Sequence, residues 1–343
     1  MRHYVPAQDL GGRPHLIVDG APRPGTVCTL SHWPRTPTPD ALRADLSAEI
    51  ALRALERPDL VPDVDAVSID HYDEDGLVAL AFLTVEGLAA AHAGLLVEAA
   101  RVGDFGVVTG RAGALVSFAL AAVADPERSP LDALRGAHRP TDWLEVCSTA
   151  ARAALALLPG IAEHPEDHEA LWGREARAYD ASVAALASGA VTIEERPDAD
   201  LAIVRVADVP ATAATAATAT ATAATAWGGR PVHPAAIHSA TACLRIATLW
   251  GRRYEVRFRY ETWVRLESRR PRPRVDLSAM AEALSAAEGA GARWAFDGAG
   301  AVTPALHLVD APSALEPARF VDEVHGELLA LDEGPPAWDP YAG

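Results

Sequence analysis

The sequence contains no lysine and very little cysteine. All 30 basic side chains other than histidine are therefore arginine, which together with abundant alanine is typical of a GC-rich genome and gives arginine content little functional weight. The 3 cysteines are Cys28, Cys147 and Cys243, which lie far apart without a Cys-x-x-Cys spacing. This spacing indicates neither a disulfide framework nor a zinc knuckle. We expect buried free thiols.

Long apolar runs are also missing. No stretch of about 18 uncharged apolar residues occurs, and the segment Met1–Pro6 lacks the apolar core of a signal peptide. We therefore expect a cytoplasmic, globular protein that does not engage a membrane.

Positive charge is scarce relative to negative charge. The formal net charge of -17 repels the phosphate backbone of long nucleic acids, so we expect no long DNA or RNA partner. A small anionic substrate is still compatible with a local basic patch.

The length of 343 residues and the 50% apolar composition favour two domains with substantial cores. An almost pure Ala/Thr stretch at 210–226 reads as a linker. We predict an α/β domain over 10–195, a connecting strand over 196–209, this linker, and a smaller α+β domain over 227–335.

In the first domain, short apolar runs alternate with longer helical patterns. Buried strands are predicted at His15–Val18, Thr26–Leu30 and Val64–Ile69, each ending in polar residues. Helices are predicted at 38–55, 86–101, 111–124, 141–158 and 166–188. This order predicts a parallel sheet flanked by helices.

In the second domain, we predict a helix over Pro234–Trp250 and a strand over Tyr254–Tyr260 that continues in extended form over Thr262–Glu267. A further helix is capped near Asp276 and ends near Ala287. The order favours an α+β domain.

The segment His71-x-Asp73-x-Asp75-Gly76 directly follows a predicted strand. Alternate side chains of an extended strand end point to one side, so an imidazole and two carboxylates can converge there. These ligands suit Mn or Mg better than zinc, and Gly76 would permit a tight turn into the next helix. The alternative is an acidic surface loop.

Other segments have a similar form. Asp19 and His32 each follow an apolar run, and Asp104 stands between two glycines. Ligand sites of open α/β sheets gather at the carboxyl ends of the strands, so these side chains and the His71 segment are expected to meet in one crevice. Taken singly, Asp104 is more often a turn residue, and His32 more often a capping or core histidine, than a metal ligand.

These residues resemble the DHH phosphoesterases. His71, Asp73 and Asp75 match the first motif of that family, and Asp19, His32 and Asp104 match its second, third and fourth. The resemblance implies two Mn ions, with Mg as the alternative, held by Asp19, His32, His71, Asp73, Asp75 and Asp104. Among them His71, Asp73, Asp75 and Asp104 are the expected catalytic residues.

The chain departs from the DHH pattern in two ways. Ser31 and Trp33 replace the outer residues of Asp-His-His, which removes a histidine that contacts substrate in the family. The second and third motifs here precede the first, so the resemblance implies a permuted strand order.

The last third resembles DHHA1, the substrate-binding domain that often follows the DHH domain. The resemblance lies in Trp263–Arg270 and Arg274–Ala281, which are similar to its strand, Ser-x-Arg turn and helix, whereas the Gly-Gly-Gly-His signature is absent near Ala290–Trp294. The chain is thus identified as a member of an uncharacterised branch of the DHH/DHHA1 superfamily.

The region from Arg252 to Arg274 is rich in arginine, whose guanidinium groups bind phosphate bidentately. Prolines stiffen its end, so we predict substrate binding by Arg269, Arg270, Arg272 and Arg274. The alternative is a set of solvated charges that pair with nearby glutamates.

The leading functional hypothesis is a Mn-dependent phosphoesterase for a small phosphate-containing substrate such as a nucleotide or short oligonucleotide. Two cations bridged by Asp19 and Asp104 would activate a water molecule. The alternatives are a degenerate DHH-like module that binds a nucleotide or protein without turnover, and a structural protein without metal. A homodimer is one assembly compatible with the sequence.

Overall fold

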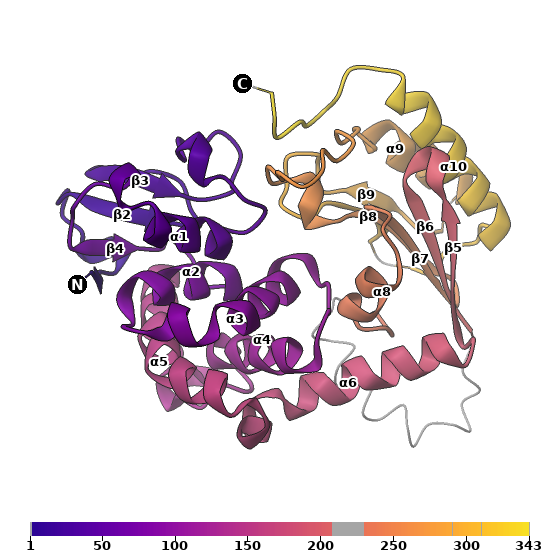
Figure 1. Ribbon diagram of the computed structural model, residues 1–343. Coiled ribbons are helices and arrows are strands. Elements are labelled where there is room, and N and C mark those ends of the chain that lie inside the picture. Colours follow the sequence, from indigo (N-terminus) through magenta and orange to yellow (C-terminus); the bar gives the residue numbers. More distant parts are fainter. Residues whose placement is uncertain (1, 208–229, 290, 310, 343) are drawn as a thin grey trace. The chain divides into compact units, whose positions relative to one another are not determined.

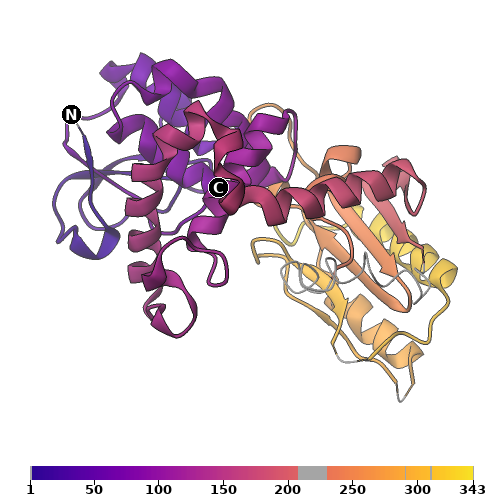
Figure 2. The ribbon, with the colours of Figure 1, turned by 90° about the horizontal axis from the view of Figure 1, so that it is seen from below.

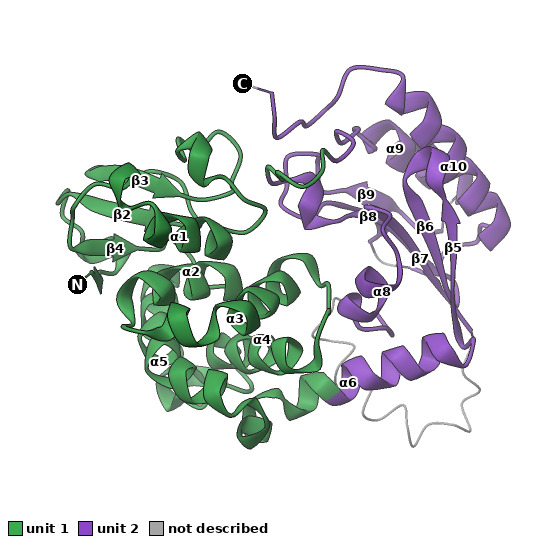
Figure 3. Cartoon of the chain, viewed as in Figure 1, with its two compact units in different colours: residues 1–176, 265–270 green, residues 177–264, 271–343 purple. Residues whose placement is uncertain are grey.

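The structure, a computed structural model, describes residues 2–207, 230–289, 291–309 and 311–342. The predicted linker at 210–226 lies outside these residues. The chain divides into two compact units, with residues 1–176 and 265–270 in unit 1 and residues 177–264 and 271–343 in unit 2 (Figure 3). The division falls inside helix α6 (Glu169–Ala187), earlier than the predicted domain end at 195.

Unit 1 contains a four-stranded parallel sheet in the order β1-β4-β2-β3, as the alternating pattern predicted. Its strands are β1 (His3–Tyr4), β2 (His15–Val18), β3 (Thr26–Leu30) and β4 (Ala66–Ser68). All residues of β2 and β4 are buried, which explains why these strands lack the apolar and polar alternation of a half-exposed strand.

The helices of unit 1 pack in sequence, each against the next (Figure 1). They are α1 (Ser47–Glu56), α2 (Glu74–Thr84), α3 (Leu88–Phe105), α4 (Arg111–Ala124) and α5 (Trp143–Glu163). Helices α1 and α2 also contact the sheet, so the ends of its strands face the beginnings of these two helices.

The predicted helix over 38–55 was wrong in its first part. Residues Asp40–Leu42 form a 3-10 turn, and α1 begins only at Ser47 after Leu46 in extended conformation. The reason is tertiary, because α1 receives its N-terminal cap from a distant side chain, as described below.

Helix α5 is long and apolar enough to cross a membrane by length and composition, the one such helix in the described part of the chain. Core helices pass the same test. One face of α5, including Val146, Ala150, Ala154 and Leu158, is buried, and the helix packs against α3 and α4. This pattern is that of a core helix.

Unit 2 contains a six-stranded mixed sheet in the order β5-β6-β7-β8-β10-β9. The strands are β5 (Val191–Arg196), β6 (Leu201–Val206), β7 (Arg245–Trp250), β8 (Arg253–Phe258), β9 (Trp294–Phe296) and β10 (Ala305–Leu308). The predicted connecting strand at 196–209 is therefore β6, which is an integral strand of this sheet paired with both β5 and β7.

Helices cover both faces of this sheet (Figures 1 and 2). Helices α9 (Ser278–Ala287) and α10 (Pro317–Asp332) pack on one face, where Phe320 and Tyr254 stack. Helix α8 (Pro234–Ala240) and the end of α6 pack on the other face, over β5, β6 and β7.

The predicted helix over Pro234–Trp250 was wrong, because its second half is strand β7. Five of the six residues of Arg245–Trp250 are buried, since both faces of β7 are covered. A strand buried on both faces loses its two-residue alternation and cannot be told from a buried helix by periodicity. The extended segment expected at Thr262–Glu267 is likewise irregular, after a 3-10 turn at Tyr260–Thr262.

Arg274 is a structural arginine at the centre of unit 2. Its side chain is fully buried, and its guanidinium donates to the carbonyl oxygens of Ala299 at 2.9 Å, Ala301 at 2.5 Å and Val302 at 2.8 Å and to Thr262 Oγ1 at 2.6 Å. Burial lowers the pKa of Arg274 to about 9. The guanidinium thus joins the 299–302 loop to the end of the sheet.

Replacing Arg274 by methionine should destabilise unit 2 by about 3 kcal/mol or more, because several buried carbonyl oxygens lose their donor. The control is Arg272→Met, which removes one exposed ion pair with Asp332 and should cost less than about 1 kcal/mol. Urea unfolding of both variants measures the difference. Equal costs would contradict a structural role for Arg274.

Candidate metal centre

Asp19 follows β2 and lies at the centre of the site. Its backbone has a φ of 45°, a left-handed conformation that aspartate tolerates better than most residues. The side chain is fully buried. Ser47 Oγ donates to Asp19 Oδ1 at 2.8 Å, whereas Asp19 Oδ2 is a buried oxygen without a recorded hydrogen bond among the described residues.

His32 follows β3 and approaches Asp19 from the neighbouring strand. Its Nδ1 lies 2.6 Å from the carbonyl oxygen of Asp45, so Nδ1 carries a proton and donates it. Its Nε2 lies 3.3 Å from Asp19 Oδ1, 3.4 Å from Asp104 Oδ2 and 3.8 Å from Asp75 Oδ2. A proton on Nδ1 leaves the Nε2 lone pair available to a cation in the neutral imidazole.

Asp75 lies in the first turn of α2 and supplies the missing cap of α1. Its Oδ2 accepts from Ser47 N at 2.7 Å and its Oδ1 accepts from Ala48 N at 2.9 Å. These amides at the start of α1 have no acceptor within their own helix. Asp75 therefore fixes α1 against α2 while it faces His32.

His71 and Asp73 form the second side of the site. His71 Nε2 lies 2.7 Å from Asp73 Oδ2 and 3.3 Å from Asp19 Oδ2, and His71 Nδ1 lies 2.8 Å from Asp70 Oδ1. Asp73 is also the N-cap of α2, because its Oδ1 accepts from Gly76 N at 2.8 Å. Asp70 thus orients the imidazole from behind, as second carboxylates commonly do for metal-binding histidines.

The expected alternation of His71, Asp73 and Asp75 along a strand end was wrong. Strand β4 ends at Ser68, Asp73 caps α2 and Asp75 lies inside it. Gly76 is likewise helical and makes no tight turn. A Cβ at Gly76 would lie 3.0 Å from Asp73 Oδ1 and 3.2 Å from Asp19 Oδ2, so the glycine provides space for the two carboxylates.

Asp104 comes from the last turn of α3, and Gly106 with a φ of 64° caps that helix. The interpretation of Asp104 as a simple turn residue is therefore wrong. Its Oδ2 is buried without a recorded hydrogen bond in the described part of the chain. A Cβ at the neighbouring Gly103 would lie 2.6 Å from Glu74 Cβ, so this glycine lets α3 approach α2 closely.

The buried acids of the site perturb one another. Burial and then the charge of Asp19 raise the pKa of Asp75 to about 7, and burial and then Asp75 hold the pKa of Asp104 well above its usual value. Burial alone would raise the pKa of Asp19, but hydrogen bonds with His32 and His71 outweigh it and keep that pKa below its usual range.

The histidines respond in the opposite sense. Burial favours the neutral form of His32, but the hydrogen bond and charge of Asp19 raise its pKa to about 9. Burial would likewise lower the pKa of His71. The charge of Asp73 outweighs burial and raises this pKa far above its usual value. The carboxylates thus attract positive charge, which protons or cations can supply.

The structure brings all predicted ligands together. Their donor atoms form two groups within 4.8 Å, one of Asp19, His32 and Asp75 and the other of Asp19, His71 and Asp73. Asp19 belongs to both groups. Asp104 joins the first through its contact with His32. Carboxylate oxygens with imidazole nitrogens suit a hard or borderline divalent cation such as Mn.

The predicted arginines are divided between the two units. Arg269 and Arg270 are exposed in a segment, 265–270, that belongs to unit 1. Arg272 and Arg274 belong to unit 2, where Arg272 pairs with Asp332 at 2.9 Å and Arg274 donates to backbone carbonyls. We therefore keep only Arg269 and Arg270 as candidates for binding substrate at the metal centre.

Asp45 holds the 265–270 segment within unit 1. Asp45 Oδ1 accepts from Glu267 N at 2.7 Å and Ser268 N at 2.8 Å, and Arg265 N donates to the His32 carbonyl at 3.0 Å. Burial would raise the pKa of Asp45, but the hydrogen bonds of Ser268 outweigh it and lower the pKa. The same residue thus orients His32 and anchors this segment.

Sequence reasoning missed Ser47, Asp45 and Asp70. Asp70 directly precedes His71, and that adjacency was the one available signal. Ser47 and Asp45 act through contacts with residues far away in the sequence, for which no local pattern exists.

The absence of a side chain at Gly76 leaves space for two candidate ligands. The Gly76→Ala variant should bind Mn about tenfold more weakly, because the methyl group displaces the carboxylates of Asp73 and Asp19. Gly326→Ala in α10 is the control, since a Cβ there meets no described atom within 4 Å. Calorimetric titration with Mn measures both variants, and equal affinities would count against the proposed crowding.

The contacts of Asp45 with the 265–270 segment should depend on pH. A carboxyl whose pKa is lowered by folding stabilises the folded form above its unfolded pKa, and this stability is lost as pH falls through the folded pKa. The amides of Glu267 and Ser268 should therefore lose protection from hydrogen exchange progressively as pH falls from about 4 toward the lowered pKa of Asp45. In Asp45→Ala they should be unprotected at pH 7 as well. Unchanged exchange in that variant would contradict the anchoring role.

Comparison with known proteins identifies a family. The model of a family of unknown function (DUF6687) matches residues 1–326. Neither the curated proteins nor the solved structures contain a match to the chain. Because the match spans nearly all of the sequence, the chain belongs to this family of unknown function, DUF6687.

Proposed function

We propose that the protein is a metal-dependent phosphoesterase that hydrolyses a small phosphodiester or phosphomonoester, such as a nucleotide or a short oligonucleotide. Mn is the expected metal and Mg the alternative. The position of Asp19 carries the proposal. Its two carboxylate oxygens face two separate groups of ligand atoms. A carboxylate in this position is suited to bridge a pair of cations.

Two bound cations would supply a hydroxide near neutral pH and would stabilise the charge of the transition state. Residues of this chain would hold the two cations in place. Asp19 separates the His32 group from the His71 group, and Asp104 contacts the His32 group. Asp19 would contribute a ligand to both groups, whereas Asp104 would contribute to the His32 group alone, since its recorded contact with a ligand atom is with His32.

Both imidazoles are held in the orientation that metal binding needs. The Asp45 carbonyl fixes Nδ1 of His32, and the Asp70 carboxylate fixes Nδ1 of His71. In each ring Nε2 points to Asp19. Such partners usually raise the metal affinity of a histidine, and their loss commonly lowers it by about 10-fold to 100-fold.

We further propose that the chain is a distant, permuted relative of the DHH phosphoesterases, with unit 2 in the place of DHHA1. The motif order differs along the chain, but the strands β2, β3 and β4 are parallel neighbours. Parallel strands end at one edge of the sheet, so their order in sequence does not alter which residues meet there. Arg269 and Arg270 would hold the substrate phosphate.

A second candidate is a degenerate module that binds a nucleotide or protein partner without turnover. Trp33 favours it, because this residue stands where the resemblance implies a second histidine. Its ring packs against His71 with centroids 5.2 Å apart. An indole there can stack with a base but cannot transfer a proton to a phosphate oxygen.

Metal content and turnover distinguish these candidates. We expect about two Mn ions per chain, and Mn-dependent hydrolysis of a generic phosphodiester that falls more than about 100-fold in Asp19→Asn. Asp59→Asn is the control, because Asp59 lies on the surface and pairs only with Arg57 in the described part of the chain. Asp75→Asn is a poorer test, since Asp75 also caps α1.

Bound metal without turnover would move the assignment to the binding module. A protein that takes up no Mn and hydrolyses no phosphodiester would contradict the phosphoesterase and leave a metal-free binding module or a structural protein. Circular dichroism of Asp19→Asn must show an intact fold for the loss of activity to count.

A further inference from the structure

The two faces of strand β8 differ sharply in chemistry. Tyr254, Val256 and Phe258 point into the core formed with α9 and α10. Successive side chains of a strand alternate, so Arg253 and Arg257 point to the opposite face, with the buried Glu255 between them. That face is apolar under α8 and charged over β8 and β10.

A cavity of about 200 Å³ opens over the charged part of this face. Its lining carries arginines, acids and one histidine, from Arg230, Arg253, Glu255, Arg257, Asp297 and His307. The register of the strands brings these side chains together. Glu255 is paired with His307, and Trp250 with Arg253, across neighbouring strands. With histidine neutral, three arginines face two acids, so the cavity is positive by one charge in a chain of net charge -17.

The carboxylate of Glu255 is shared between two of these arginines. Arg230 Nε donates to Glu255 Oε1, and Arg257 Nη2 lies 3.6 Å from Glu255 Oε2. Arg257 Nη1 donates to the Thr303 carbonyl at 2.7 Å, but its buried Nε has no recorded acceptor among the described residues. Burial and then the charge of Arg230 lower the pKa of Arg257.

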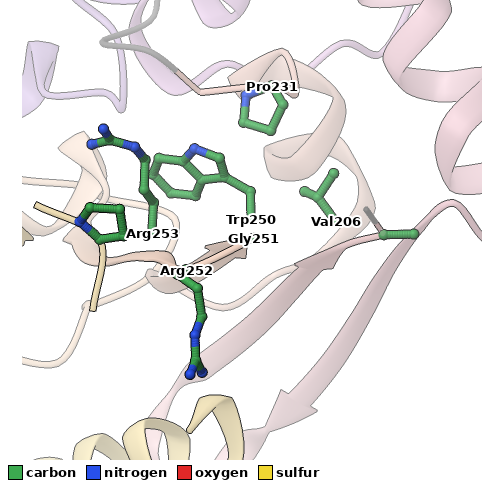
Figure 4. Close-up of a pocket in the computed structure, with 8 residues that line it drawn as sticks. Val206, Pro231, Trp250, Gly251, Arg252 and Arg253 are labelled. Carbon is green, nitrogen blue, oxygen red and sulfur yellow. The ribbon is translucent and has the colours of Figure 1, made fainter. Parts of the chain in front are cut away.

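Arg253 is the exposed arginine of the group. No hydrogen bond or ion pair of its side chain is recorded within the described part of the chain, although Arg252 beside it pairs with Glu316 at 3.1 Å. Figure 4 shows Arg252 pointing away from Trp250, whereas Arg253 lies along the indole. The guanidinium of Arg253 is thus placed for an external anion.

A larger hollow of about 550 Å³ adjoins the first, because Trp250 and Arg253 line both. Its other walls include Pro312. Val206 and Pro231 also line it (Figure 4). Flat, largely apolar walls next to a guanidinium accept an aromatic ring, and the volume lies in the range of small-molecule sites.

We propose that this face of unit 2 is a second ligand site, which binds a phosphate ester carrying a flat ring, that is, a nucleotide. The phosphate contacts Arg253 and Arg257, which supply charge-assisted hydrogen bonds. The base packs against Trp250 and Pro231. The site shares no residue with the metal centre, and its binding needs neither metal nor hydrolysis.

The test is calorimetric titration of the full chain in EDTA with AMP, adenosine and inorganic phosphate. Removing divalent cations separates this site from the proposed phosphoesterase activity. AMP should bind more tightly than either fragment, because each contributes one half of the recognition. Arg253→Ala should weaken AMP binding about tenfold, and Trp250→Ala should weaken it about fivefold or more.

Arg319→Ala is the control of equal charge change, because Arg319 lies on α10 and pairs with Glu323 at 2.8 Å. It should leave AMP affinity unchanged. The proposal is overturned if AMP does not bind, if inorganic phosphate binds as tightly as AMP, or if Arg253→Ala and Arg319→Ala weaken binding equally. These results hold whether or not the protein hydrolyses phosphodiesters.

Discussion

The buried negative charge around Asp19 is the constraint on which unit 1 depends. Asp19, Asp75 and Asp104 lie almost fully out of water and within reach of His32. Burying several carboxylates together is costly unless positive charge or hydrogen-bond donors compensate them. The local structure is organised to provide that compensation, through the backbone amides of α1, the Ser47 hydroxyl and the two imidazoles.

The same groups serve stability and the proposed chemistry. Asp75 ties α1 to α2, Asp73 begins α2, and Gly76 and Gly103 let these helices approach the carboxylates and α3. Helix capping and close packing thus fix the positions of Asp73, Asp75 and Asp104. The other three candidate ligands lie in the segments that follow β2, β3 and β4. Ligands held in this way are pre-organised, so the proposed cation would require little rearrangement.

Unit 2 uses its charged side chains differently. Arg274 is enclosed by carbonyl oxygens and stabilises a loop, whereas Arg253 and Arg257 lie on an open sheet face beside Trp250. Arginines that look alike in the sequence thus have opposite roles. Strand alternation and the cover supplied by α8, α9 and α10 decide which of them reach solvent.

The sequence alone determined three of the four parallel strands of unit 1, most of its helices and the identity of the candidate ligands. The apolar runs that end in Asp19 and His32 are local signals in the sequence. These residues meet in the fold because neighbouring parallel strands end at the same edge of the sheet. Tertiary structure decided the rest. Strand β7, buried on both faces, has no readable period, and the roles of Ser47, Asp45 and Arg274 arise from partners far along the chain. Long-range contacts leave no periodic trace in a single sequence, which is the physical reason these features required the fold.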